Sequence, residues 1–216
     1  MHVIIAANKN HKPFRDPSLA TLEIQHLSRP GLEPASFRVD AGSCLSLSGP
    51  SGAGKSLLLR AIADMDPHDG EVLLDSRSFK EFSGPDWRRQ VMLVPAESSW
   101  WWPTVGEHFE QIEVENLERL GFEAGALSWR VDRLSTGEKQ RLALLRALSR
   151  KPAVLLLDEP TAALDADSIH VVEALIGQYR QQQGAAVIWV SHDAAQIARV
   201  ADRQLKIRNG KVVPNE

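Results

Sequence analysis

The residues best suited to chemistry form one short segment, Gly49-Pro-Ser-Gly-Ala-Gly-Lys55-Ser56. Its glycines lack a Cβ, so the backbone can bend tightly and turn its N–H groups inward around a phosphate. Lys55 supplies a compact cation for the β and γ phosphates, and Ser56 supplies a hydroxyl ligand for Mg²⁺. The segment fits the pattern G-x-x-x-x-G-K-[ST] in full and predicts a nucleoside-triphosphate site. We assign nucleotide contacts to Gly49, Pro50, Ser51, Gly52, Ala53, Gly54, Lys55, Ser56 and Leu57.

Two carboxylates, Asp158 and Glu159, end the apolar run Ala153-Val-Leu-Leu-Leu157. Open α/β sheets bind their ligands at the carboxyl ends of such strands. We expect Asp158 to hold Mg²⁺, directly or through water, opposite Ser56. Glu159 is placed to polarise a water against the γ phosphate.

A predicted helix N-terminus lies between these two motifs in the sequence. Ser135 and Glu138, three residues apart, form the capping-box pattern that begins a helix. On spacing alone this pattern indicates only a well-capped helix, although the N-terminus of a helix can also receive an anion.

The elements that position these groups alternate between apolar strands and helices, which predicts a mostly parallel sheet covered on both faces. The fold class is therefore α/β, a P-loop core with a small antiparallel β subdomain and an inserted helical lobe. Predicted strands are 21–27, 35–39, 44–48, 71–74, 91–94, 153–157 and 186–190; predicted helices are 55–63, 134–149, 167–182 and 194–200. An Asn209-Gly210 hairpin closes the chain.

We treat 1–216 as one domain. Within it, residues 1–18 mix proline, asparagine and charge and are interpreted as an N-terminal extension. Residues from about 95 to 133 are rich in glutamate and aromatic side chains, and we interpret them as an inserted lobe that is mostly helical from about 105 to 120.

Composition limits the function classes. A net charge of −3 and a pI of about 6.2 give no global basic field, so nucleic acid is not an expected partner. The single cysteine, Cys44, is interpreted as a small buried hydrophobe, and it can form no disulfide within the chain. No apolar run approaches the length of about 18 residues that spans a membrane. We therefore expect another chain to hold the protein at any membrane where it works.

Three segments together resemble the ATP-binding cassette ATPases. Leu134-Ser-Thr-Gly-Glu-Lys-Gln-Arg141 resembles the signature of that family. Thr161-Ala-Ala-Leu-Asp165 is similar to its D-loop, and Val190-Ser-His192-Asp193 is similar to the segment that carries its switch histidine. The resemblance covers nearly the whole chain.

The resemblance implies that two such domains pair head to tail and enclose two ATP molecules. Catalysis is then assigned to Glu159, His192 and Lys55, with Ser56 and Asp158 on Mg²⁺. One chain supplies these residues to each site, and the other supplies Ser135 and Gly137. Asp165 is expected at the dimer interface, where it couples the two sites.

The chain also departs from the family pattern. Ala96 follows Val94-Pro95 where a metal-touching glutamine is usual, and Glu97 comes next. Thr136 replaces a glycine of the signature, and Glu138 stands where glutamine is commoner. No aromatic residue for adenine stacking stands in 28–32; the nearest rings are His26 and Phe37.

The function expected from the resemblance is that of the ATP-hydrolysing subunit of an ABC transporter, with ATP and Mg²⁺ as cofactors. It would sit peripherally on the cytoplasmic face of a membrane, bound to a separate membrane-embedded subunit, and form a homodimer with ATP. Metal or iron export is a candidate activity. Trp100, Trp101 and Trp102 either pack under the inserted lobe or line a groove for the partner's helix. The alternative is a regulatory or weakly hydrolysing cassette that dimerises on ATP without driving transport.

Overall fold

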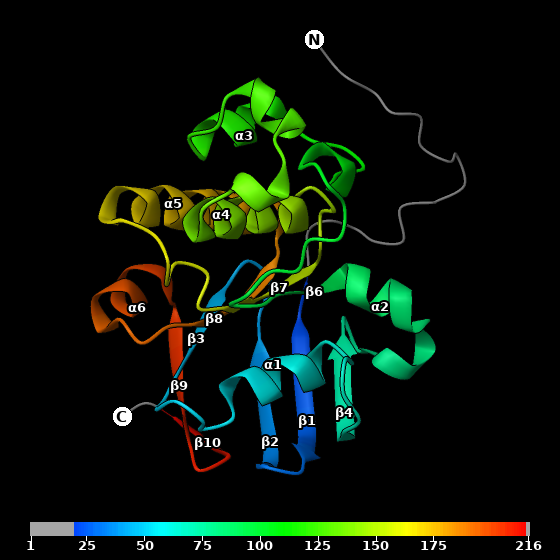
Figure 1. Ribbon diagram of the computed structural model, residues 1–216. Coiled ribbons are helices and arrows are strands. Elements are labelled where there is room, and N and C mark those ends of the chain that lie inside the picture. The colour runs from blue at the N-terminus through cyan, green and yellow to red at the C-terminus, as the bar shows by residue number, and fades with distance from the viewer. Residues whose placement is uncertain (1–19, 215–216) are drawn as a thin grey trace.

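The computed structural model describes residues 20–214, so the predicted extension 1–18 lies outside the described residues. The chain forms two sheets with helices around them (Figure 1). The strands are β1 (Leu22–Arg29), β2 (Leu32–Val39), β3 (Cys44–Ser48), β4 (Asp69–Leu74), β5 (Arg77–Ser78), β6 (Val91–Val94), β7 (Val154–Asp158), β8 (Ala186–Val190), β9 (Arg203–Arg208) and β10 (Lys211–Pro214). The α-helices are α1 (Lys55–Ile62), α2 (Gly84–Gln90), α3 (Val114–Arg119), α4 (Thr136–Leu148), α5 (Ala166–Gln183) and α6 (Ala194–Val200).

The larger sheet has the strand order β10-β9-β3-β8-β7-β6. All neighbouring pairs from β9 to β6 are parallel, and only the β9–β10 hairpin is antiparallel. β7 and β8 are buried along their whole length, as expected of strands covered on both faces. The predicted α/β class and the parallel core are confirmed.

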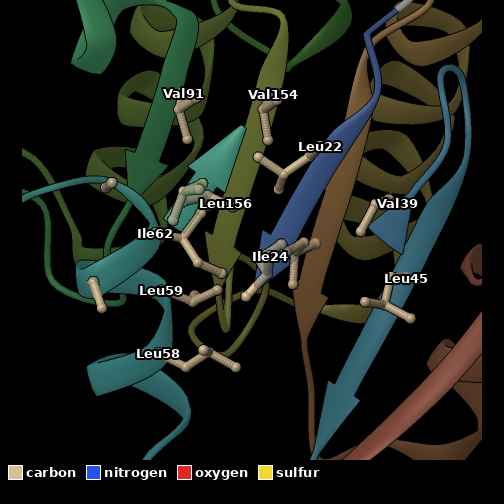
Figure 2. Close-up of a cluster of buried hydrophobic side chains, with 14 of the residues drawn as sticks. Leu22, Ile24, Val39, Leu45, Leu58, Leu59, Ile62, Val91, Val154 and Leu156 are labelled. Atoms are coloured by element: carbon tan, nitrogen blue, oxygen red, sulfur yellow. The ribbon is translucent and has the colours of Figure 1, made fainter. Parts of the chain in front are cut away.

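The smaller sheet is antiparallel, with the order β2-β1-β4-β5. Helix α1 lies between the two sheets, because it contacts β1 on one side and β6 and β7 on the other. Figure 2 shows the apolar side chains that fill this layer. They come from β1, α1 and the central strands, and they include Leu22, Ile24, Leu58, Leu59, Ile62, Val91, Val154 and Leu156.

The opposite face of the larger sheet is covered by α4 and α5, which lie side by side in Figure 1. Leu142 and Leu145 of α4 and Val172 and Ile176 of α5 pack in one cluster with β7 and β8. Each helix begins at a polar cap: Ser135 accepts from the Glu138 N–H, and Asp165 accepts from the Ser168 N–H. These caps fix where the two helices start.

The inserted region is less helical than predicted. Residues 105–120 contain a 3₁₀ turn at Gly106–His108 and the short helix α3, separated by a non-helical segment. Phe109, only 7% exposed, ends the 3₁₀ turn with extended backbone and turns inward to the core. Burial of this ring therefore interrupts the helix that composition alone suggested.

None of the helices in the described range 20–214 is both long and apolar enough to cross a membrane.

Candidate ATP-hydrolysis site

Three adjacent parallel strands bring the predicted site together. β3 leads into the phosphate loop, β7 ends at Asp158, and β8 lies between them and leads to His192. Because parallel strands end at the same edge, the loops that follow them meet there. The topology alone thus explains why residues more than a hundred positions apart share one site.

The phosphate loop has tight backbone geometry. Gly49 has a φ of 145°, and a Cβ added to it would lie 2.2 Å from the Ile207 carbonyl oxygen of β9. Gly54 has a φ of 108° and caps α1. Both values lie in the region that side-chain-bearing residues avoid, so glycine is required at both positions. The loop is also held from outside, since the Gly210 N–H donates to the Ala53 carbonyl over 3.0 Å.

Lys55 lies across this loop. Its ammonium donates to the carbonyl oxygens of Gly49 at 2.8 Å and Pro50 at 3.0 Å, and the residue is 7% exposed. Burial lowers the pKa of Lys55, while the negative charges of Glu159 and Asp158 act in the opposite direction. The side chain is therefore already positioned at the predicted phosphate site.

Asp158 and Ser56 provide the oxygen ligands that Mg²⁺ prefers. Asp158 is 9% exposed, and its carboxylate has no hydrogen-bond or ion-pair partner among residues 20–214. A nearly buried carboxylate without such a partner fits a bound cation. Ser56 is exposed at the first turn of α1. Together the two residues are suited to hold the metal.

Glu159 and His192 are brought into direct contact. The Nε2 atom of His192 lies 2.9 Å from Oε1 of Glu159, and both side chains are partly exposed. Glu159 has a φ of 50°, a left-handed backbone that costs a residue with a side chain about 1–3 kcal/mol. With this φ, the backbone at Glu159 no longer continues the extended path of β7. The contact with His192 orients the Glu159 carboxylate. The predicted pairing of these two residues in one site agrees with this geometry.

Gln140 was missed by sequence reasoning, and it ties α4 to this turn. Its Nε2 donates to the Glu159 carbonyl at 2.8 Å, and its Oε1 accepts from the Ala163 N–H at 3.2 Å. The side chain is 6% exposed. A polar residue on the buried face of a predicted helix was the only sequence signal.

The signature residues are anchored to their own chain. A Cβ on Gly137 would lie 2.9 Å from the Ala163 carbonyl oxygen, so this glycine allows α4 to approach the D-loop. Ser135 is exposed, and its N–H donates to Glu138 Oε2 at 2.7 Å. Within the described part of the chain, neither Ser135 nor Gly137 has a hydrogen bond to the phosphate loop. Ser135 is exposed on the surface of the single chain, and Gly137 is half-buried.

Asp165 caps α5 and does not contact the phosphate loop. Its two oxygens accept from the N–H and hydroxyl of Ser168, both at 2.9 Å. These hydrogen bonds lower the pKa of Asp165. Ala162 and Ala163, which precede Asp165 in the D-loop, are exposed as well.

The residues that stand where the family pattern has a metal-touching glutamine are exposed. Ala96 and Glu97 both lie on the surface just after β6. Of the two rings closest to the expected adenine position, Phe37 is buried in the core at 9% exposure, whereas His26 is exposed at an irregularity of β1. Phe37 therefore cannot stack on a base.

The three tryptophans differ in exposure. Trp100 packs against the core cluster, whereas Trp101 is 60% exposed and Trp102 is 52% exposed. His108 holds the segment: its Nε2 accepts from the N–H groups of both Trp101 and Trp102 at 3.0 Å, and its Nδ1 donates to the Thr104 carbonyl at 2.9 Å. The rings of Trp101 and Trp102 are therefore exposed, while hydrogen bonds to His108 hold their backbone in place.

The fold and this site define a P-loop nucleotide-binding protein in which a carboxylate, Glu159, and a histidine, His192, are in contact beside the phosphate loop. Residues 32–162 match the family model for ABC transporters. The chain is 34% identical over 223 residues to the aliphatic sulfonates import ATP-binding protein SsuB 2 of Paracoccus denitrificans, covering 97% of this chain and 86% of that protein. The chain therefore belongs to the ABC transporter family as an ATP-binding subunit, and it is an ATPase of that family.

Other relatives differ in their named direction of transport. The hemin import ATP-binding protein HmuV of Rhodococcus jostii is 36% identical, with 87% of this chain and 70% of that protein covered. The probable iron export ATP-binding protein FetA of Escherichia coli is 34% identical, with 77% and 80% covered. A bacterial Atm1-family ABC exporter solved with ATP bound shares the fold, with a TM-score of 0.78 and 24% identity; it matches 99% of this chain, which spans 41% of that chain.

Proposed function

We propose that this ATPase works as a head-to-tail homodimer that closes around two Mg-ATP molecules and powers transport through a separate membrane subunit. The observation that carries the proposal is the division of the site. Lys55, Asp158, Glu159 and His192 gather at one edge of the sheet. Gly137 instead packs beside the chain's own D-loop, and Ser135 is exposed. A second copy would bring its α4 N-terminus to the γ phosphate, which would then lie between two helix N-termini.

The dimer is tested with Glu159→Gln, which keeps the shape of the side chain and removes its charge. We expect this variant to bind ATP, to lose ATPase activity and to form dimers when Mg-ATP is added, as measured by light scattering after size exclusion. Lys55→Ala in the same background is the matched control and should stay monomeric, because it removes the phosphate contact. A strictly monomeric Glu159→Gln protein at saturating Mg-ATP, with the membrane subunit present, would refute the proposal.

Mg²⁺ is part of this proposal, held by Ser56 and Asp158. When bound, the ion would neutralise phosphate charge. Asp158→Asn is expected to weaken Mg-ATP binding more than binding of ATP in the presence of EDTA. Equal loss in both conditions would argue against a metal role for Asp158.

The surface formed by Trp101 and Trp102 is proposed to contact the membrane subunit on the cytoplasmic side. Both rings are exposed, and tryptophan is enriched at the centres of interfaces. The double variant Trp101→Ala/Trp102→Ala should keep the basal ATPase activity of the isolated chain and lose its stimulation by the membrane subunit. Unchanged stimulation would exclude this surface from the interface.

Metal or iron export is the substrate class that we propose to test first. Its support is the similarity to FetA, while the equally similar SsuB and HmuV are named for import. Vesicles containing the chain and its membrane subunit should move iron away from the ATP side. Accumulation in the other direction, or no iron movement, would overturn the assignment.

A second candidate function rests on Ala96. Its methyl group cannot coordinate a metal or accept a hydrogen bond, so a cassette that binds ATP and dimerises with little turnover is the alternative. ATP-dependent dimers of the unmodified chain without measurable hydrolysis, even with the membrane subunit, would favour it.

A further inference from the structure

The loops that carry Glu159 and His192 are joined at a second point, apart from the contact between these two side chains. Thr161 lies two residues after Glu159, and Gln196 lies four residues after His192, in the first turn of α6. The Nε2 atom of Gln196 donates to Thr161 Oγ1 at 3.0 Å, and the Thr161 hydroxyl donates to Gln196 Oε1 at 3.2 Å. The two loops are therefore connected twice.

The second connection is buried, whereas the first is open to water. Gln196 is 2% exposed and Thr161 is 7% exposed. The side chains of His192 and Glu159 are 44% and 33% exposed. A buried hydrogen bond cannot be replaced by a bond to water without cost, so it fixes geometry more firmly than an exposed contact does. The buried pair is therefore the one that sets how the two loops stand relative to each other.

The chain between His192 and Gln196 is short and held by hydrogen bonds. The Asp193 carboxylate caps α6 by accepting from the N–H groups of Ala195 at 2.8 Å and Gln196 at 3.2 Å. The Asp193 N–H donates to Ser191 Oγ at 3.1 Å. Because His192 lies between Ser191 and Asp193, its backbone is fixed on both sides. A shift in the first turn of α6 would move the His192 ring with it.

Gln196 is also held from α5, which lies above α6 in Figure 1. The same Nε2 atom donates to Glu173 Oε1 at 3.0 Å. Glu173 in turn accepts two hydrogen bonds from Arg199, at 2.9 and 2.7 Å. Both hydrogens of the Gln196 amide are thus used, one by Thr161 and one by Glu173. An ionised carboxylate in place of this amide could supply neither of them.

We propose that Gln196 is a positioning residue for hydrolysis, because its bonds to Thr161 hold α6 where the His192 ring meets the Glu159 carboxylate. This role rests on the proposed function, in which Glu159 and His192 take part in hydrolysis. Within residues 20–214 the side chain of Gln196 has its hydrogen bonds with Thr161 and Glu173 and none with the phosphate loop. Its loss should therefore lower kcat and leave KM for ATP nearly unchanged.

The experiment measures steady-state ATPase activity and urea unfolding of the full chain. Gln196→Met keeps the length of the side chain without its polar atoms, and Thr161→Val removes only the hydroxyl of the partner. We expect each to lower kcat at least about tenfold, since a displacement of about 1 Å in an active site can cost about a hundredfold. Thr161→Ser keeps the hydroxyl and should retain most of the rate.

Glu173→Gln is the matched control. Its amide oxygen can still accept from Gln196, but the ion pair with Arg199 is lost. This variant should unfold at a lower urea concentration and keep its kcat. A tenfold loss of kcat in Glu173→Gln would show that any weakening of this region slows hydrolysis, and it would overturn the specific role of Gln196.

Repeating Gln196→Met in a His192→Ala background separates positioning from a general structural effect. If Gln196 acts through His192, it should change the single-turnover rate by less than about twofold there, because the two effects are then not additive. An equal loss in both backgrounds, or an unchanged kcat in the folded Gln196→Met protein, would overturn this inference alone. A His192→Ala protein with the full rate would overturn the proposed role of the histidine, and this inference with it. If Gln196→Met does not fold, Thr161→Val makes the same comparison.

Discussion

From the two hydrogen bonds of Gln140 we predict that its loss lowers both the free energy of unfolding and the ATPase rate. Replacing this residue with leucine keeps its volume close to the original but removes the donor to the Glu159 carbonyl and the acceptor for the Ala163 N–H. Ala163 is exposed and its N–H can turn to water, so the main loss falls on the more enclosed carbonyl of Glu159. Glu159, the proposed catalytic residue, is then no longer held from α4.

The magnitude follows from these two bonds. A buried hydrogen bond contributes about 1 kcal/mol net, and a partner left unsatisfied costs about 1–3 kcal/mol. We expect Gln140→Leu to lower the free energy of unfolding by about 2 kcal/mol, which corresponds to a fall in Tm of about 4–8 °C for a chain of this size.

The catalytic effect comes from the strained turn. Glu159 keeps its φ of 50° only while its neighbours hold it, so losing the bond from Gln140 lets the peptide relax. A displacement of about 1 Å in an active site can cost about a hundredfold in rate. We expect kcat for ATP to fall by at least about tenfold, with little change in KM because the phosphate loop is untouched.

Urea unfolding and steady-state ATPase measurements test both parts. Gln140→Glu is the matched variant, because it keeps an acceptor for Ala163 but loses the donor to Glu159; it should resemble the leucine variant. Gln181→Ala, which is exposed, should behave like the unmodified chain. If Gln140→Leu retains both the unfolding free energy and kcat, the reasoning about this contact is wrong.

Three further predictions concern the scaffold. Hydrogen bonds from Arg60 and Arg29 hold the pKa of Asp66 well below its usual range. The stability that these ion pairs add is complete above the unfolded pKa of about 3.9 and is lost progressively as the pH falls toward the lower folded value. Asp66→Asn should therefore destabilise the protein at pH 7, and urea unfolding should show this difference shrinking as the pH is lowered below about 3.9. Burial raises the pKa of the Cys44 thiol to about 12, so iodoacetamide should leave it unmodified at pH 8 until urea is added; rapid labelling of the folded chain would contradict this. Gly49→Ala would place a Cβ 2.2 Å from the Ile207 oxygen, and it should abolish ATP binding measured by fluorescent-nucleotide titration, with wild-type affinity as the contrary result.

Much of the parallel core could be predicted because several of its strands are short apolar runs, as in Val91–Val94 and Ala186–Val190. The phosphate loop and the pair Asp158 and Glu159 were equally visible, since their function depends on residue types at fixed spacing. The irregular lobe was not predictable, because the position of Phe109 depends on tertiary burial rather than on local preference. Helix α2 was missed as well, although Ser83 caps it and proline stands in its first turn.

Gln140 and Glu159 show a different limit of prediction from sequence. No local pattern distinguishes a glutamine that bonds a carbonyl 19 residues away from one that faces water. The positive φ of Glu159 likewise arises where β7 ends against β8, with the Glu159 N–H donating to the Val190 carbonyl over 3.2 Å. Contacts of this kind exist only once the sheet has formed, and sequence reasoning could name the catalytic residue without seeing what holds it.

Helix α4 also carries Arg146, which contacts the tryptophan segment. Arg146 lies six residues after Gln140 on this helix, about 9 Å along its axis. Its guanidinium carbon stands 4.6 Å from the Trp100 ring centre and 4.8 Å from that of Trp101, and its Nη1 donates to the Ser99 carbonyl at 3.1 Å. Burial, and secondarily the charge of Arg150, lowers the pKa of Arg146 to about 10, and it remains a cation at neutral pH.

If the proposed contact with the membrane subunit displaces Trp101, helix α4 would transmit the displacement to Glu159. Arg146 contacts Trp101 at one end of this path, and Gln140 bonds Glu159 at the other. Arg146→Ala should keep the basal ATPase rate, because Gln140 still holds Glu159, but should reduce stimulation by the membrane subunit. Arg146→Lys would keep the charge without the planar stacking and should restore stimulation only in part. Full stimulation of the alanine variant would show that the partner's signal reaches the site by another route.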